Sequence, residues 1–567
     1  MYRCAMPLRS GRRSLRLRAP YSSFARLGTL ALVIAGAGCS DDGSAAKETG
    51  ESGNVDPDPD FGEFGPLSGP EGKGSFRFGA ASAATQIEDQ NPNTDWYVFT
   101  LPISQGGVGK GTPVGEAARG YSKAVEDVQL VADLNLDSYR FSIEWGRIEP
   151  QRDVIDEDGL AHYDAVLDAL VEAGIRPNVT VHHFSNPIWV DDPLNIDCVD
   201  GPTDANLCGF GHPQGGPLVI EEIREHAKLL AERYGDRVDD WGTINEPINY
   251  MMASHGVGAF PPGKFEIFQF SEKLMPAIRD YLLAHAAAYE AIKTYDTVDA
   301  DGDGVAAHVG LTLNVVEWVP ARDNQVSDDP EDVAARDRVY FAYAYLIPEA
   351  IRQGRFDMDL DGEFELALPE LEGTMDWLGV QYYIRAGVTG QNGLVPLVQA
   401  TPCFDTLDQG SCLPPLDPTY CVPEMRYEYN PNAMYDILMD FSSRWPDLPM
   451  VISEGGIATE VGERRAENTV RTLEQVERAI DDGADIRGYY HWSLFDNFEW
   501  AEGFVPRFGL YRVDYGDYSR SPTLGAEVFG EIARTRAMTE AQRSQFGGEG
   551  PLTPEGEIPS GGLCVGE

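Results

Sequence analysis

Two glutamates in this chain stand where catalytic carboxylates are often found, at the ends of short apolar runs. Glu246 closes the run Val238–Glu246 and is followed by Pro247, which cannot continue a strand or lie inside a helix. Glu454 closes the run that begins at Met450 and is followed by two glycines. Cleavage of a glycosidic bond uses two carboxyl groups that flank the scissile bond. Either glutamate alone is more often a solvated or salt-bridged loop residue, so this interpretation depends on the surroundings of the pair.

Short apolar runs alternate with helix-period segments along most of the chain. Strands are predicted at Phe76–Ala83, Ser138–Trp145, Arg176–Phe184, Val238–Glu246, Val309–Trp318, Met375–Tyr383, Met450–Gly455 and Ile486–Leu494. Helices are predicted at Tyr121–Leu134, Leu160–Ala173, Ile220–Tyr234, Ala277–Thr294, Val333–Gln353, Pro431–Arg444, Ala466–Asp482 and Ser521–Arg536. Eight buried strands that alternate with helices predict an α/β fold, a single (β/α)8 TIM barrel. Long inserted loops follow the strands, on the face where such barrels keep their active sites.

Polar and aromatic side chains gather at the ends of the predicted strands. A sugar ring has apolar C–H faces, on which tryptophan packs, and a rim of hydroxyls that amides, imidazoles and carboxylates bind. Each of these side chains alone is more often an ordinary core or loop residue. Their convergence at one rim indicates a carbohydrate site, and the residues are Gln86, Arg140, His183, Asn245, Tyr383, Trp492, Glu499 and Trp500.

These motifs resemble glycoside hydrolase family 1, the β-glucosidase-type retaining glycosidases, from Phe76 to about Ala537. The T-x-N-E-P motif at Thr243–Pro247 implies that Glu246 is the acid/base, and the I-S-E-G-G motif implies that Glu454 is the nucleophile. A further match is RFGLYRVDY, at Arg507–Tyr515. The resemblance also implies nucleophile-supporting roles for Arg140 and Tyr383, and sugar contacts for Gln86, His183, Asn245, Trp492, Glu499 and Trp500.

The sequence departs from the family pattern at three places. Gly455 replaces an asparagine after the nucleophile, Gln381 replaces another asparagine, and Phe184-Ser185 replaces Trp-Asp. The last two changes bear on sugar or leaving-group preference, and none removes a catalytic group. A carboxylate at Glu499 accepts hydrogen bonds from the 4- and 6-hydroxyls of a sugar and repels a 6-phosphate.

We therefore expect a retaining exo-β-glycosidase, most simply a β-glucosidase. It would release a terminal non-reducing sugar from β-glucosides or short oligosaccharides by double displacement, with no metal or other cofactor. The alternatives are a β-galactosidase, β-fucosidase or β-mannosidase of the same mechanism. A non-catalytic sugar-binding lipoprotein is disfavoured because both carboxylates are retained, and a calcium-dependent adhesin has only weak support.

The first 39 residues have the pattern of an export signal. An arginine-rich start precedes the apolar stretch Leu27–Ala37, which is too short to span a bilayer. Small residues then precede Cys39, which resembles a bacterial lipoprotein signal with Cys39 as the lipidated N-terminus; the alternative is a simply cleaved signal peptide. The protein is expected at the outer membrane or cell surface as a lipoprotein, or in the periplasm or medium. Residues 40–75 are predicted to be a flexible acidic linker, 76–540 the glycosidase domain, and 541–567 a Gly/Pro-rich tail.

The net charge limits the classes of binding partner, and the cysteine content indicates the redox compartment. The formal net charge of −48 repels nucleic acid and anionic lipid, so the expected partner is a carbohydrate, with membrane contact only through Cys39. An even number of cysteines after the signal favours disulfides in an exported chain. Pairing Cys198 with Cys208 and Cys403 with Cys412 would leave Cys421 for Cys564, although the sequence does not fix the connectivity.

Two acidic segments match the first half of a calcium-binding loop. Asp299–Gly304 and Asp357–Gly362 both read D-x-D-x-D-G. A full calcium loop places a bidentate glutamate at its twelfth position, where this chain has Gly310 and Leu368. An acidic turn is therefore favoured over a calcium site at both segments.

Overall fold

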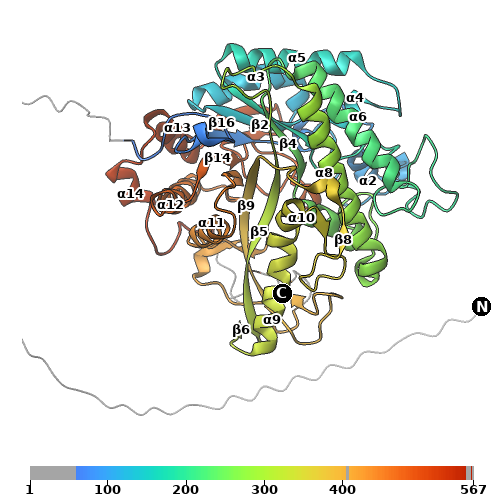
Figure 1. Ribbon diagram of the computed structural model, residues 1–567. Helices are drawn as coiled ribbons and strands as arrows, with labels where there is room; N and C mark the ends of the chain where they lie inside the picture. The colour runs from blue at the N-terminus through green and yellow to red at the C-terminus, as the bar shows by residue number, and fades with distance from the viewer. Residues whose placement is uncertain (1–58, 404–407, 557–563, 565–567) are drawn as a thin grey trace, which may run out of the picture. The chain divides into compact units, whose positions relative to one another are not determined.

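The computed structural model describes residues 59–403, 408–556 and Cys564, and in it eight parallel strands close into a barrel (Figure 1). Each strand pairs with the next, and the last pairs with the first. This confirms the predicted (β/α)8 fold. The strands are β1 (Phe78–Ala81), β2 (Ser138–Ser142), β3 (Arg176–His182), β4 (Asp240–Asn245), β5 (His308–Arg322), β9 (Trp377–Thr389), β13 (Met450–Gly455) and β14 (Ile486–Trp492).

The predicted helices between the strands are all present, and one of them is split into two α-helices. The predicted helix Val333–Gln353 consists of α9 (Pro330–Tyr340), a π-helical turn and α10 (Leu346–Gln353). The other predicted helices are α3 (Gly120–Asp133), α5 (Glu157–Glu172), α6 (Gly216–Tyr234), α8 (Met275–Tyr295), α11 (Ala433–Arg444), α12 (Gly462–Asp481) and α13 (Leu524–Thr535). No helix among the residues described has the length and apolarity to cross a membrane.

Sequence chemistry explains where these helices begin and how they attach to the barrel. The side chain of Asp156 accepts hydrogen bonds from two backbone N–H groups and so caps the start of α5. Leu160, Val166, Leu167 and Leu170 recur at helical spacing and are buried against the barrel. Burying this apolar stripe stabilises the helix in place.

β5 and β9 are longer than the sequence predicted and project beyond the barrel. They remain paired as far as Pro320 and Val388, and Figure 1 shows them side by side. Short strands pair with these extensions: β6 (Gln325–Val326) with β5, and β10 (Thr401–Pro402) and β12 (Tyr427–Glu428) with β9, while β11 (Cys421–Val422) pairs with β12. The prediction stopped at the apolar runs, whereas the extensions are stabilised by pairing with these inserted strands.

The predicted flexible linker and tail are partly wrong. Residues 59–75 pack on the barrel, where Phe61 is buried with its ring 4.6 Å from that of Phe76. In the tail, α14 (Glu540–Phe546) is helical and Leu552 is buried. A few apolar side chains suffice to order Gly- and Pro-rich segments when a large apolar surface is already formed. The predicted signal sequence, Cys39 and residues 40–58 of the predicted linker lie outside the residues described.

Three disulfides join six cysteines, all of which lie after the predicted signal. Cys198 pairs with Cys208, Cys403 with Cys412 and Cys421 with Cys564, with Cα–Cα distances of 5.6, 4.8 and 5.2 Å. The first two close loops in the insertions above the barrel. The third ties the end of the tail to β11, 143 residues earlier.

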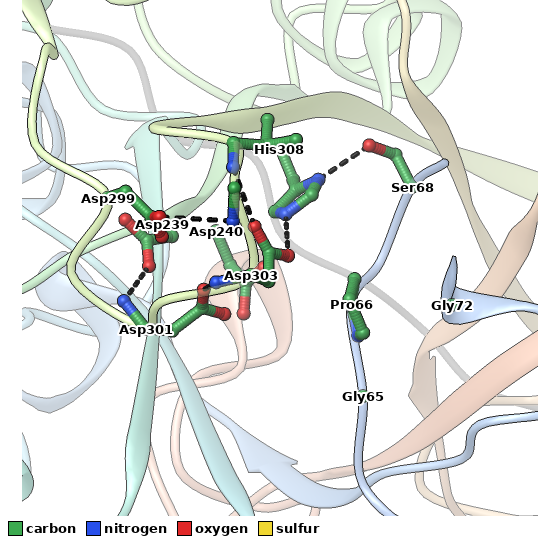
Figure 2. A network of polar contacts seen from close by, with 12 residues as sticks. Gly65, Pro66, Ser68, Gly72, Asp239, Asp240, Asp299, Asp301, Asp303 and His308 are labelled. Carbon is green, nitrogen blue, oxygen red and sulfur yellow. Dashed lines mark hydrogen bonds and ion pairs between the residues drawn. The ribbon is translucent and has the colours of Figure 1, made fainter. Parts of the chain in front are cut away.

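The acidic loop that begins at Asp299 contacts Asp239, just before β4, and His308, the first residue of β5, so it lies at the end of the barrel where the strands begin. Figure 2 shows these residues together. Asp239, just before β4, accepts hydrogen bonds from the backbone N–H groups of Ala300 and Asp301 at 3.0 and 2.6 Å. Arg176 at the start of β3 lies 3.0 Å from Asp239 and 2.7 Å from Asp301. A guanidinium ion thus contributes positive charge within this acidic turn.

A histidine ties the same loop to the segment before the barrel. The ring of His308, the first residue of β5, lies between Asp303 at 2.7 Å and Ser68 at 2.5 Å (Figure 2). In the second acidic loop, Asp357 accepts hydrogen bonds from the backbone N–H groups of Asp359, Leu360 and Gly362. Both loops are therefore organised by contacts within the chain.

Candidate active site

Glu246 and Glu454 lie at the same end of the barrel and line one cavity of about 220 Å³. Glu454 is near the end of β13, and Glu246 follows β4 at the start of α7 (Pro247–Met251). Both side chains are buried. Glu246 has a φ of 40°, in the left-handed region that non-glycine residues rarely adopt. Such backbone strain is typical of functional sites.

Glu454 is held by a cation and a hydroxyl. Nη1 of Arg140 lies 2.6 Å from Oε1 of Glu454, and the hydroxyl of Tyr383 donates to Oε2 at 3.0 Å. Nε2 of His183 lies 4.0 Å from Oε1. Burial and the nearby Arg140 hold the pKa of His183 well below its usual value, so the ring is neutral. The negative charge on Glu454 is therefore balanced by Arg140.

Glu246 has a neutral partner. The side-chain amide of Asn249 donates to its Oε2 at 2.7 Å. Burial, and after it the negative charge of Glu454, together raise the pKa of Glu246 to about 8. Asn249 was not predicted, although its position three residues after Glu246, on the first turn of α7, places it on the same side of the helix.

The two carboxyl groups thus differ in the charge that their surroundings favour. Burial also raises the pKa of Glu454, but the guanidinium of Arg140 and the hydroxyl of Tyr383 oppose that shift. A single proton on the pair is therefore most stable on Glu246, with the negative charge on Glu454. The arrangement offers a nucleophilic carboxylate and a proton donor in the same cavity.

Asn245 is oriented by three donors. Its Oδ1 accepts hydrogen bonds from Arg140 at 2.7 Å, Thr312 at 2.7 Å and Gln381 at 3.0 Å. Because the oxygen is fully used, the NH₂ group is the part of this amide available to a ligand. Gln381 still supplies an amide donor although it departs from the family's asparagine.

Glu499 marks another part of the same cavity. Burial, and then the charge of Glu454, raise the pKa of Glu499 to about 8. Nε2 of Gln86, which is fully buried, lies 3.3 Å from Oε2 of Glu499. The ring of His183 is nearly parallel to those of Trp492 and Trp500, with both centroid distances 5.9 Å. All eight residues predicted around the carboxylates are thus brought together, Gln86 and Arg140 through their contacts with Glu499 and Glu454.

The other sequence departures are accommodated locally. A side chain at Gly455 would place its Cβ only 3.0 Å from the ring of Tyr489, so glycine suits this position. Phe184 lines the cavity, and Ser185 donates to the buried carboxyl of Glu144 at 2.8 Å. Phe184 therefore forms part of the cavity wall, and Ser185 is hydrogen-bonded behind it.

A model of a protein family described as "Glycosyl hydrolase family 1" matches residues 72–538. The chain belongs to glycosyl hydrolase family 1. It is an O-glycosyl hydrolase with retaining β-glycosidase chemistry.

Relatives of this family 1 enzyme include differently named glycosidases. A β-galactosidase of Pyrococcus woesei is 29% identical over 82% of this chain and 97% of the relative. A coniferin β-glucosidase of Pinus contorta is 28% identical over 80% and 90% of the two chains. A solved β-glycosidase from Pyrococcus horikoshii is 29% identical, covers 85% of this chain and 99% of its own, and has a TM-score of 0.68. The family is therefore established, whereas the relatives differ in the sugar they are named for.

Several residues of the cavity were not predicted from the sequence of this family 1 enzyme. They lie on β5, on the extension of β9, on α7 and in the loops and insertions that follow the strands, at positions outside the motifs. The unpredicted lining residues include Asn249, Phe260, Asn314, Ile384, Met425, Tyr427 and Glu502. Asn314 lies on β5, where it follows the apolar run at alternate spacing, and this position could have indicated a residue facing the barrel interior.

Proposed function

We propose that this protein is a retaining exo-β-glucosidase with Glu454 as its nucleophile and Glu246 as its acid/base. The observation that carries the proposal is the different setting of the two carboxyl groups. Arg140 lies against Glu454, whereas the pKa of Glu246 is raised to about 8. A retaining glycosidase needs this combination of an ionised nucleophile and a protonated acid.

In the first step, a carboxylate oxygen of Glu454 attacks the anomeric carbon as the bond from that carbon to the leaving oxygen breaks. Glu246 gives its proton to that oxygen, and a covalent glycosyl-enzyme forms. The negative charge of Glu454 is lost in this ester, so the pKa of Glu246 falls. Glu246 can then take a proton from water, whose oxygen attacks the anomeric carbon and releases Glu454.

The surrounding groups have roles that match this sequence. Arg140 and the hydroxyl of Tyr383 orient Glu454 and favour its anionic form. The NH₂ group of Asn245 would bind the sugar 2-hydroxyl, a contact that strengthens in the transition state. Trp492 offers an apolar face to the ring, while Glu499, His183, Gln86 and Trp500 complete the sugar site.

The preference for unphosphorylated glucose is supported by Glu499. Its carboxyl group can accept hydrogen bonds from the 4- and 6-hydroxyls, whereas a 6-phosphate would be repelled by the charge on Glu454 and by any ionised fraction of Glu499. A second candidate function is a β-galactosidase of the same mechanism, whose site would accept the axial 4-hydroxyl of galactose. Relatives named β-galactosidase support this candidate.

A panel of nitrophenyl β-glycosides tests this assignment. Wild type should give its highest kcat/KM on the β-glucoside, and Glu454→Gln should lose at least ~10³-fold in kcat, on the scale of removing a catalytic nucleophile. A higher kcat/KM on the β-galactoside would favour the second candidate. Equal activity of wild type and variant would contradict the proposed nucleophile.

We also infer from the sequence that the protein is exported and anchored through a lipid on Cys39. The basic start, the apolar stretch and the small residues before Cys39 support this inference. Labelling of cells with a radioactive fatty acid should mark the wild-type protein but not Cys39→Ala. Equal labelling of both would exclude Cys39 as the lipid site.

A further inference from the structure

The catalytic cavity has one wall that comes from outside the barrel. The β11–β12 hairpin lies in the insertion that follows β9, and two residues of its turn region, Met425 and Tyr427, line the cavity together with Glu454. The turn is tight, because the backbone N–H groups of Met425 and Arg426 both reach the carbonyl of Val422. The hairpin therefore contributes side chains to the site without belonging to the catalytic scaffold.

The base of this hairpin is joined to the C-terminal tail by a buried arginine. Arg464, on α12, is 1% exposed. Its guanidinium donates to the carbonyl of Thr419, in the turn just before the hairpin, at 2.7 Å, to that of Cys421 at 2.6 Å, and to the tail carbonyl of Thr553 at 3.1 Å. One side chain thus connects the hairpin, the tail and the helix that follows the nucleophile strand.

Further contacts join the tail to the same part of the hairpin. The backbone N–H of Leu552, a buried residue, donates to the Thr419 hydroxyl at 2.8 Å, and the Tyr420 hydroxyl donates to the carbonyl of Gly550 at 3.1 Å. The Cys421–Cys564 disulfide adds a covalent link. The tail therefore holds the hairpin through side-chain, backbone and covalent contacts.

An ion pair holds the other end of the hairpin against the sugar site. Arg426, between the two cavity residues of the turn, lies 2.8 Å from Glu502. Glu502 follows Glu499 and Trp500 in the loop after β14 and also lines the cavity. The position of Met425 and Tyr427 relative to the sugar site is thus fixed at both ends of the hairpin.

We propose that the C-terminal tail, residues 547–556 with Cys564, is a positioning element of the leaving-group site, and that the hairpin it holds selects apolar leaving groups. The inference rests on the proposed glycosidase function. Three apolar residues that are not among the predicted sugar contacts line the cavity, Met425, Ile384 and Phe260, and we call them its apolar wall. A leaving group that buries apolar surface against this wall gains binding energy, whereas a second sugar must desolvate hydroxyls there.

Two alkyl β-glucosides of similar leaving-group acidity separate this effect from the chemistry of bond cleavage. Methyl β-glucoside has a leaving group too small to cover the wall, whereas hexyl β-glucoside can bury its chain there. Wild type should have a kcat/KM at least about tenfold higher for the hexyl than for the methyl compound, on the scale of a few buried methylenes. A wild-type ratio near one, with both substrates hydrolysed, would overturn the inference.

The role of the tail is tested with Cys421→Ser/Cys564→Ser. Its hexyl-to-methyl ratio should fall by about tenfold, mainly through a higher KM for the hexyl compound, while kcat for the methyl compound stays within about twofold. Cys403→Ser/Cys412→Ser is the matched control, because it removes another disulfide of the same insertion and should keep the wild-type ratio. An unchanged ratio in the first variant, or an equal loss on both substrates, would overturn the role of the tail.

Met425→Asn tests the apolar wall directly, even where Cys421→Ser/Cys564→Ser does not fold. Met425→Asn leaves the tail contacts intact and should lower the hexyl-to-methyl ratio by about tenfold. A wild-type ratio retained in Met425→Asn would contradict the apolar wall. Failure of wild type to hydrolyse any alkyl or nitrophenyl β-glucoside would instead contradict the proposed function, so the two failures are distinguishable.

Discussion

Arg140 lies 2.6 Å from Glu454, and the same guanidinium donates to the side-chain oxygen of Asn245 at 2.7 Å. One buried cation therefore sets both the charge of the proposed nucleophile and the orientation of the amide next to the acid/base. Glu246, with the neutral Asn249 as its partner, keeps the proton. The division of roles between two chemically identical side chains follows from this difference.

The proposed acid predicts how activity depends on pH. Glu246 must be protonated to donate to the leaving group, and burial together with Glu454 raises its pKa to about 8. Activity is therefore present below that pKa and lost above it. We expect kcat/KM, which reports the free enzyme, to fall by about tenfold per pH unit above pH ~8. A plateau that extends to pH ~10 would contradict this assignment.

Replacing Glu454 by a neutral residue should change the pKa of Glu246. Because that charge raises the pKa of Glu246, Glu454→Gln should lower the pKa of Glu246. Carbon-13 NMR of the glutamate carboxyl carbons can follow the titration in both proteins, and Glu246→Gln identifies the signal. An unchanged or higher pKa in Glu454→Gln would show that the two groups do not interact.

Removal of the proposed acid should affect substrates unequally. Glu246→Gln cannot donate a proton, so hydrolysis of alkyl β-glucosides should fall by about 10²–10⁴-fold, the usual contribution of general acid catalysis. Formation of the glycosyl-enzyme from dinitrophenyl β-glucoside should fall much less, because its leaving group needs no proton. Pre-steady-state release of dinitrophenol measures this step, and an equal loss on both substrate types would contradict the role of Glu246.

Arg176 should stabilise the folded protein through its ion pairs in the acidic loop that begins at Asp299. This arginine contacts Asp239 and Asp301, and Asp239 is fully buried. Arg176→Ala leaves the carboxylates without that counter-charge and should lower the free energy of unfolding by about 2–4 kcal/mol, measured by urea denaturation.

Chelation of calcium should leave the midpoint of urea denaturation of the wild-type protein unchanged. A large drop on chelation would instead indicate that a cation stabilises this loop.

The barrel, and the gathering of the candidate site residues at one end of it, could be predicted because their signals are local. Strands such as Met450–Gly455 are continuous buried runs, and the proposed catalytic residues lie near their ends or just after them. Met425 and Tyr427 could not be predicted, since their approach to Glu454 depends on how a long insertion folds back over the barrel. The packed tail was missed for a related reason: Leu552 is a lone apolar residue whose burial depends on a surface formed elsewhere in the chain.

The proposed mechanism requires a covalent bond between the sugar and Glu454. A dinitrophenyl 2-deoxy-2-fluoro-β-glucoside should trap it, because fluorine slows both steps while the good leaving group lets the first one proceed. Mass spectrometry of the intact protein should show the addition of one fluorosugar, and peptide mapping should place it on Glu454. An enzyme that hydrolyses β-glucosides yet forms no adduct, or carries the adduct on another residue, would contradict the proposed mechanism.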